Sequence, residues 1–182
     1  MGNKIQDLSP NDYAGGFDYS TKYTYDYAGR LLSQENALEQ TSYVNYDWLG
    51  NAISKTDVAG NISTYTYDAF GRVLTQTTPF DELRSTRITY AYDGNGNTVS
   101  KITEEITTES TSLLNKTVYV YDSRNNLAEV RSYTSDSAYI VTASYTYDKM
   151  CRMLTSTSCT YTTSYTYDAY GNVSRITYPG GG

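Results

Sequence analysis

Tyrosine and threonine alternate along much of this chain, in the pattern of half-buried β-strands. The recurring unit is Tyr-x-Tyr-Asp, in which two rings stand two residues apart and therefore lie on one face of a strand. The Tyr-Asp pair occurs seven times in this context, at intervals of 20 to 29 residues. Six copies have the earlier tyrosine as well, and Val44 replaces it in the other. The pattern predicts a protein built almost entirely of β-strands.

Each Tyr-Asp pair is followed by the signals of a tight turn. Three residues after the aspartate stands glycine in five copies, and Asn125 or Cys151 in the other two. Aspartate at the first place of a type I turn accepts from backbone N–H groups ahead of it, and glycine at the fourth tolerates a positive φ. Asparagine also adopts the left-handed conformation. Cysteine does so less easily, which predicts a distorted turn at Cys151.

One repeat is therefore one antiparallel hairpin of about 20 residues, with arginine or asparagine opening the return strand. Seven hairpins amount to roughly fourteen strands, and an open twisted sheet of that size is expected to curve and spiral. Tyrosine ladders along it would bury area, because Leu, Ile, Val and Phe together number only 31 of 182 residues. The expected structural motif residues are Tyr23, Tyr25, Asp26, Gly29, Arg30, Tyr46, Asp47, Gly50, Tyr65, Tyr67, Asp68, Gly71, Arg72, Tyr90, Tyr92, Asp93, Gly96, Tyr119, Tyr121, Asp122, Tyr145, Tyr147, Asp148, Arg152, Tyr165, Tyr167, Asp168 and Gly171.

The repeats predict one continuous array over residues 19–182, preceded by a leading segment or partial hairpin over residues 1–18. Residues 103–116 are expected to form longer strands with an exposed connection. Residues 78–82 are expected to form a loop, since Pro79 cannot donate to a strand ladder. Neither end carries an evident cap, so we expect neighbouring repeats in a longer parent chain. Unpaired edge strands also predict self-association of copies.

Composition excludes several classes of function. The chain has no histidine, which removes the Ser-His-Asp triad and histidine metal ligands. A net charge of -6 argues against nucleic acid, whose phosphates require a basic surface. No apolar run approaches the ~18 residues that span a membrane. We expect no catalytic site, no cofactor and no enzymatic activity.

One segment imitates a calcium loop. Asp93-Gly-Asn-Gly-Asn97, with Glu104 at the twelfth place, has the oxygen-ligand spacing of an EF-hand. Thr98 stands where that loop needs glycine, and flanking helices are not expected. The repeat already explains the aspartate, so we predict a turn and no metal site.

The two cysteines, Cys151 and Cys159, are too few for a disulfide framework. Two free thiols and a disulfide across the sixth hairpin both fit the sequence, because the strand register decides between them.

The repeat resembles the YD, or RHS, repeat over about residues 19–182. The segments Tyr65–Leu74 and Tyr165–Val173 are its closest copies. The family includes bacterial Rhs proteins, wall-associated proteins, the B and C subunits of Tc insecticidal toxins, and animal teneurins. The resemblance implies a β-strip that spirals into a hollow, solenoid-like shell, which encloses a C-terminal toxin in some members. It also implies a secreted or surface protein. The Asp-Pro dipeptide through which fuller members release the toxin is absent from this sequence.

These observations favour a non-catalytic scaffold segment, part of a β-shell that encloses or docks a polypeptide such as a toxin. The alternative is a carbohydrate-binding or adhesion module, in which tyrosine rings stack on sugars while nearby Asp and Asn bind their hydroxyls. The expected partners are neighbouring repeats, other copies, an enclosed polypeptide or glycans. Nucleic acid and membrane insertion are not expected.

Overall fold

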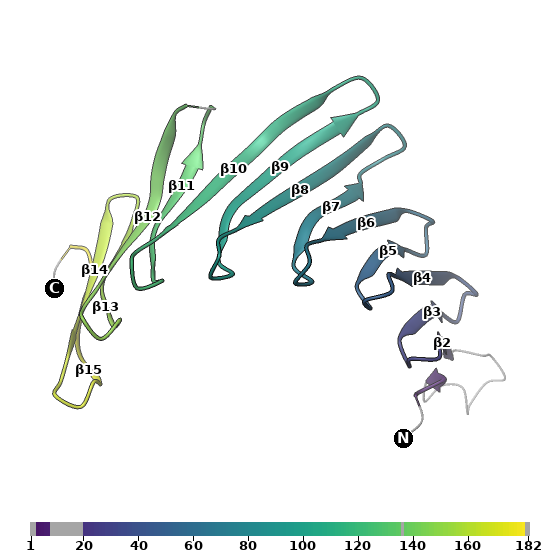
Figure 1. Ribbon diagram of the computed structural model, residues 1–182, viewed down its shortest axis with the longest axis horizontal. Coiled ribbons are helices and arrows are strands. Elements are labelled where there is room, and N and C mark those ends of the chain that lie inside the picture. The colour runs from purple at the N-terminus through teal and green to yellow at the C-terminus, as the bar shows by residue number, and fades with distance from the viewer. Residues whose placement is uncertain (1–2, 8–19, 136, 181–182) are drawn as a thin grey trace. The chain divides into compact units, whose positions relative to one another are not determined.

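The computed structural model describes residues 3–7, 20–135 and 137–180, and within them the chain forms fifteen β-strands and no helix (Figure 1). The strands follow one another in sequence order in one open antiparallel sheet, with β1 and β15 at its edges. The prediction of an all-β array of tandem antiparallel hairpins is confirmed. Most of the expected leading segment, residues 1–18, lies outside the described residues.

The sheet consists of short strands in the first half of the chain and longer ones in its centre. The strands are β1 (Gln6–Asp7), β2 (Thr21–Tyr25), β3 (Leu31–Glu35), β4 (Thr41–Tyr46), β5 (Ala52–Thr56), β6 (Ile62–Tyr67), β7 (Val73–Pro79), β8 (Arg84–Tyr92), β9 (Thr98–Thr107), β10 (Thr111–Tyr121), β11 (Leu127–Tyr133), β12 (Tyr139–Tyr147), β13 (Met153–Ser158), β14 (Tyr161–Tyr167) and β15 (Val173–Thr177). The predicted long strands between the fourth and fifth repeats are β9 and β10, of 10 and 11 residues.

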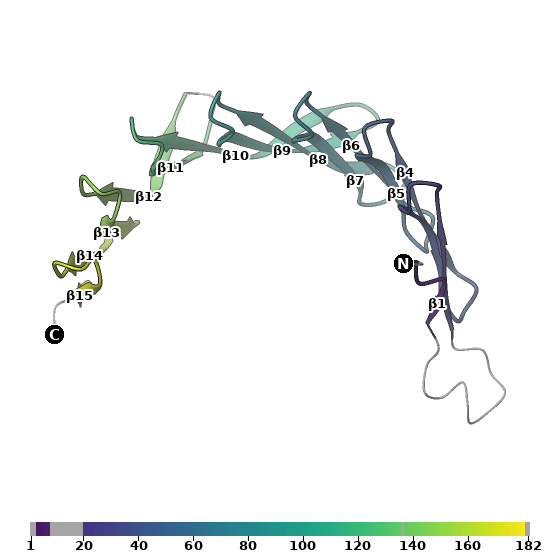
Figure 2. The same cartoon turned by 60° about the horizontal axis from the view of Figure 1, so that its bottom comes forward.

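The chain divides into two compact units, residues 1–87 with 106–110, and residues 88–105 with 111–182. Each unit is a single layer of strands (Figure 2). Neither contains a helix among its described residues, and so neither has a helix long and apolar enough to cross a membrane.

The repeat hairpins share one turn and one irregularity. In the first, the Asp26 N–H donates to the Arg30 carbonyl and the Gly29 N–H to the Asp26 carbonyl, each at 3.0 Å. Gly29 has φ 80°, so the loop is a type I turn closed by a left-handed residue. The register then shifts by one residue between Thr24 and Tyr25. The same shift occurs in the β4–β5, β6–β7, β10–β11, β12–β13 and β14–β15 pairs. The sequence predicted the turn but not this β-bulge, which bends and twists the return strand.

The two faces of the sheet differ in chemistry. In β6, Tyr65 and Tyr67 are half-buried on one face, whereas Thr64 and Thr66 are exposed on the other. Across β6 and β7, the hydroxyls of Thr66 and Thr75 lie 2.7 Å apart on the exposed side. We name these the tyrosine face and the threonine face. Register and alternation place on the tyrosine face Tyr23, Tyr25, Tyr46, Tyr65 and Tyr67 in the first unit and Tyr119, Tyr121, Tyr145, Tyr147, Tyr165 and Tyr167 in the second.

No hydrophobic side chain among the described residues is fully buried. The tyrosines on the tyrosine face are half-buried instead, because a single layer of strands covers each ring from below and from the sides only. The sheet therefore lacks an enclosed core, and its apolar area remains available on the tyrosine face.

The predicted distortion of the sixth turn is wrong. Cys151 has φ 60°, and its N–H donates to the Asp148 carbonyl at 3.1 Å, as glycine does in five of the other copies and Asn125 in the sixth. The Asp148 carboxylate also accepts from the N–H groups of Met150 and Arg152, at 2.8 and 3.0 Å. These bonds hold the turn in its ordinary form, although a left-handed non-glycine residue costs about 1–2 kcal/mol.

The loop predicted at residues 78–82 is shorter than expected. Thr78 and Pro79 still belong to β7, and the connection to β8 begins at Phe80. Pro79 is the last residue of its strand, a position where the missing N–H does not interrupt the ladder.

Candidate functional site

The aspartate after each second tyrosine organises its turn. Asp26 accepts with Oδ1 from the N–H groups of Ala28 and Arg30, both at 2.9 Å. In all seven repeats, Oδ1 accepts from the N–H four residues ahead; these aspartates are Asp26, Asp47, Asp68, Asp93, Asp122, Asp148 and Asp168. The Arg30 backbone N–H, together with its side chain, lowers the pKa of Asp26. Each turn is therefore built around an ionised carboxylate.

The arginine or asparagine of the motif binds the second carboxylate oxygen. Arg30 Nε donates to Asp26 Oδ2 at 2.6 Å, and Asn51 Nδ2 donates to Asp47 Oδ2 at 2.9 Å. The other repeats have the same contact, from Arg72, Asn97, Asn126, Arg152 and Asn172. Both side chains reach Oδ2 from the start of the return strand, which explains why the position takes either residue type. The sequence showed the two residue types without the reason for them.

In six of the seven motifs, the second tyrosine connects its hairpin to the segment of chain before it. Its hydroxyl donates to a backbone carbonyl there, and in the third repeat Tyr67 donates to Ala52 at 2.8 Å. The other hydroxyl-to-carbonyl hydrogen bonds run from Tyr25 to Lys4, Tyr46 to Leu31, Tyr121 to Thr98, Tyr147 to Leu127 and Tyr167 to Met153, at 2.7–3.1 Å. Burial raises the pKa of the Tyr67 hydroxyl, so it remains a donor at neutral pH.

Two of the three motif arginines add to this connection. The Arg30 guanidinium lies 4.7 Å from the centre of the Tyr46 ring, and that of Arg152 lies 4.6 Å from the Tyr167 ring. Stacking of this kind contributes about 0.5–1 kcal/mol at exposed sites. Tyr46 and Tyr167 are thus held by the neighbouring hairpin through both hydroxyl and ring.

A second series of turns lies at the opposite ends of the strands in the first unit. Gly60 N–H donates to the Asp57 carbonyl at 3.0 Å, and Asn61 Nδ2 donates to Asp57 Oδ2 at 2.9 Å. The β3–β4 connection is built in the same way around Asn36, with Glu39 at φ 59°. The sequence interpretation missed both because no tyrosine precedes them. Asp57-x-x-Gly-Asn61 nevertheless has the spacing of the repeat motif, and that spacing alone would have found it.

The segment that resembles a calcium-binding loop forms an ordinary repeat turn. Asp93 Oδ1 accepts from the N–H groups of Asn95 and Asn97, and Oδ2 accepts from Asn97 Nδ2, at 2.8–2.9 Å. Both oxygens are therefore engaged within the turn. Across the described part of the chain, no three His, Cys, Asp or Glu residues gather into a metal-binding group.

The disulfide across the sixth hairpin does not form. Cys151 lies in the β12–β13 turn and Cys159 in the β13–β14 turn, both exposed as free thiols. The whole of β13 separates them, a span of about 20 Å, whereas a disulfide requires Cα atoms within about 7 Å. The register settles the alternative in favour of two separate thiols.

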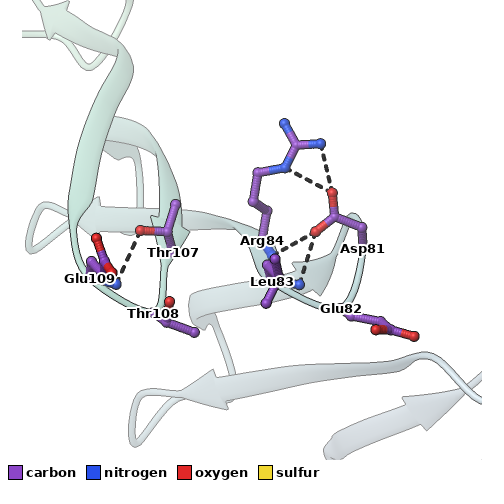
Figure 3. A pocket seen from close by; sticks show the side chains of 7 residues that line it. All are labelled: Asp81, Glu82, Leu83, Arg84, Thr107, Thr108 and Glu109. Carbon is purple, nitrogen blue, oxygen red and sulfur yellow. Dashed lines mark hydrogen bonds and ion pairs between the residues drawn. The ribbon is translucent and has the colours of Figure 1, made fainter.

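One open hollow of about 600 Å³ lies in the first unit, between the β7–β8 and β9–β10 connections (Figure 3). Arg84 pairs with Asp81 on the β7–β8 side of the hollow, with Nη2 at 2.6 Å and Nε at 2.8 Å from Oδ2. Thr107 accepts from the Glu109 N–H on the other side. The sequence predicted no site here. The hollow contains an ion pair and hydroxyls, with no nucleophile held against a base.

Comparison with known proteins identifies the repeat. The RHS repeat family matches residues 46–83, and no curated protein matches the chain. Among solved structures, TcdB2-TccC3-Cdc42 is similar, with 21% identity and a TM-score of 0.67 over 88% of this chain and 9% of that one. The Photorhabdus luminescens Tc holotoxin pore is similar at 21% identity and a TM-score of 0.65, over 92% of this chain and 9% of that one.

TcdB2-TccC3 is also similar, with 21% identity, a TM-score of 0.66 and coverage of 88% and 9%. The chain therefore spans about a tenth of the length of these structures, and at this identity the likeness establishes the fold. Residues 46–83 match the RHS repeat family, which confirms, for that segment, the family resemblance carried by the Tyr-x-Tyr-Asp hairpins.

Proposed function

We propose that this chain is a scaffold segment of a larger RHS-repeat protein, whose sheet forms part of a wall that encloses or docks another polypeptide, such as a toxin. The observation that carries the proposal is the single layer of strands with no fully buried hydrophobic side chain in the described residues. A sheet with an aromatic face is normally covered by a second layer. Here the tyrosine face supplies half of such an interface.

The geometry of the repeats supports a structural rather than a catalytic role. The turn aspartates bind their own backbone, and the second tyrosines bind the neighbouring hairpin, so both are occupied by the fold. Within each unit, the second tyrosines link hairpins to the ones before them, and such links would let the seven repeats of residues 19–182 act as one continuous array in a longer parent chain. The fold shared with Tc toxin complexes supports a secreted or surface location.

A carbohydrate-binding surface is the second candidate. The tyrosine-face rings are half-buried, and those of Tyr46 and Tyr167 are stacked against arginine guanidinium groups. Aromatic residues at the tips of the turns are far more exposed, Trp48 at 89% and Tyr170 at 92%. Free ring faces of this kind favour sugar binding at the turns.

The scaffold proposal predicts that the tyrosine face binds extended polypeptide. The probe is fluorescein-labelled β-casein, a polypeptide without a stable fold, titrated with the full chain and followed by fluorescence anisotropy. Tyr65→Ser removes a ring from the tyrosine face, and saturable binding should weaken several-fold. Tyr43→Ser is the matched control, because Tyr43 is 50% exposed on the threonine face of β4, in the preceding hairpin. Absence of binding, or equal weakening by the control, would refute the tyrosine face as the docking surface.

A further inference from the structure

Five successive turns of the first unit, from β2–β3 to β6–β7, have apolar or aromatic residues at their tips. Each turn begins with aspartate or asparagine, has two central residues, and ends with a residue of positive φ. Central positions of such turns ordinarily take polar residues, glycine or proline. Here all ten central residues are apolar or aromatic and all are exposed: Tyr27-Ala28, Ala37-Leu38, Trp48-Leu49, Val58-Ala59 and Ala69-Phe70.

The fold does not require apolar residues at these positions. In the second unit, the β8–β9 turn has Gly94 and Asn95 there, and the β10–β11 turn has Ser123 and Arg124, yet both turns have the same backbone hydrogen bonds. Side chains this exposed also add little to the stability of their own hairpin. Large apolar groups gathered on an exposed surface mark interaction sites, so we looked for the surface that would cover them.

The tips form two rows at opposite ends of the strands. Because consecutive strands are antiparallel, successive turns of the first unit alternate between the two ends (Figure 1). At one end lie Tyr27, Trp48 and Phe70, which we name the aromatic row. At the other lie Leu38 and Val58, which we name the aliphatic row. Phe70 is 84% and Leu38 is 76% exposed.

The two rows have matching intervals. Turns of one row are two strands apart, which amounts to about 9.5 Å, and the rows are offset from each other by one strand, about 4.8 Å. A second copy displaced along the strand direction would therefore bring its Leu38 to the gap between Tyr27 and Trp48. Its Val58 would reach the gap between Trp48 and Phe70. The rings of one copy and the aliphatic tips of the other would interdigitate, as apolar groups do at the centre of protein interfaces.

The charges beside the rows favour this pairing of unlike rows. Arg30 spans the first gap of the aromatic row, since its Nη1 lies 3.4 Å from the Asp47 carbonyl. Glu39 directly follows Leu38 and is exposed, so it would arrive beside Arg30 of the other copy. Two aromatic rows facing each other would instead bring Arg30 against Arg30. The occupant that fits the aromatic row best is thus the aliphatic row of a second copy.

We propose that copies of this chain associate head to tail along the strand direction, with the aromatic row of one copy seated on the aliphatic row of the next. Such a contact joins two different surfaces and leaves one free row at each end, so it extends into stacks rather than stopping at a dimer. The contact differs from pairing of the terminal strands and leaves the tyrosine face open. Its failure would leave the scaffold proposal untouched.

The chain contains its own reporter for this contact, because Trp48 is its only tryptophan. Trp48 emission of the full chain should shift to shorter wavelength as concentration rises, since docking removes water from the ring, and sedimentation should show masses beyond a dimer. The variant L38S/V58S keeps Trp48 but lacks the aliphatic row. Its emission should stay that of an exposed ring up to about tenfold higher concentration. Serine is compatible with these turns, because Ser123 occupies the same position in the β10–β11 turn.

The decisive experiment mixes two complementary variants. Y27S/W48S/F70S keeps the aliphatic row and contains no tryptophan. Added to L38S/V58S, it should restore the Trp48 shift, because one intact row of each kind is then present, and restoration also shows that both variants fold. Tyr170→Ser is the matched control, since Tyr170 is an exposed ring at the tip of the β14–β15 turn, outside both rows. It should leave the shift unchanged.

A shift that persists in L38S/V58S would overturn the head-to-tail contact, because Trp48 would then be covered by something other than the aliphatic row. A complementary mixture without a shift, or an equal loss in Tyr170→Ser, would overturn it as well. Association of the full chain without any change in Trp48 emission would assign that association to the terminal strands and likewise overturn the proposal.

Discussion

The contact between the Tyr67 hydroxyl and the Ala52 carbonyl predicts a specific loss of stability in Tyr67→Phe. The substitution keeps the half-buried ring and removes one hydrogen bond of 2.8 Å between hairpins. A bond of this kind contributes about 0.5–1.5 kcal/mol net. The carbonyl is at the start of β5 and is left without this donor, so we expect the free energy of unfolding to fall by about 1 kcal/mol.

Tyr65→Phe is the matched control, because Tyr65 stands on the same strand and the same face but its hydroxyl bonds to none of the described residues. Its effect should stay within about 0.5 kcal/mol. Urea unfolding can be followed through the fluorescence of Trp48, which lies in the turn immediately before β5. Equal losses in the two variants, or a neutral Tyr67→Phe, would refute the assignment of the second tyrosine as the link between hairpins.

Three further predictions concern the turns. Cys151→Gly should raise the free energy of unfolding by about 1 kcal/mol, because glycine adopts φ 60° without strain; thermal denaturation showing no gain would contradict this. Asn51 and the other amide donors lower the pKa of Asp47, so stability should be fully present above the unfolded value of about pH 4 and fall as pH drops below it; acid titration by circular dichroism checks the sign. Mild oxidation should leave Cys159 and Cys151 unpaired within a monomer, as thiol titration would show.

Self-association through β1 and β15, the strands at the sheet edges, is expected to grow with concentration, and a strict monomer in sedimentation experiments would count against it.

The structure corrected the sequence interpretation at specific residues. Cys151 was expected to distort its turn because cysteine disfavours positive φ, yet Asp148 holds it in place through bonds that are invisible in one-dimensional spacing. The turn at Asp57 was not predicted because no tyrosine precedes its aspartate. The sequence could not place the ends of β13, and the structure shows that Cys151 and Cys159 flank the two opposite ends of this strand.

The sequence by itself determined the hairpins, the place of every repeat turn and the all-β class. These depend on interactions within a few residues, namely the two-residue period of a strand and the hydrogen bonds of an aspartate to its own turn. Only the tertiary structure decided the β-bulges, the hydroxyl contacts from Tyr67 to Ala52 and its equivalents, and the separation of tyrosine and threonine faces across strands. The hydroxyl contacts join residues 14 or more apart, and the bulges and faces depend on the register of paired strands, in which a shift of one residue would turn every side chain to the other face.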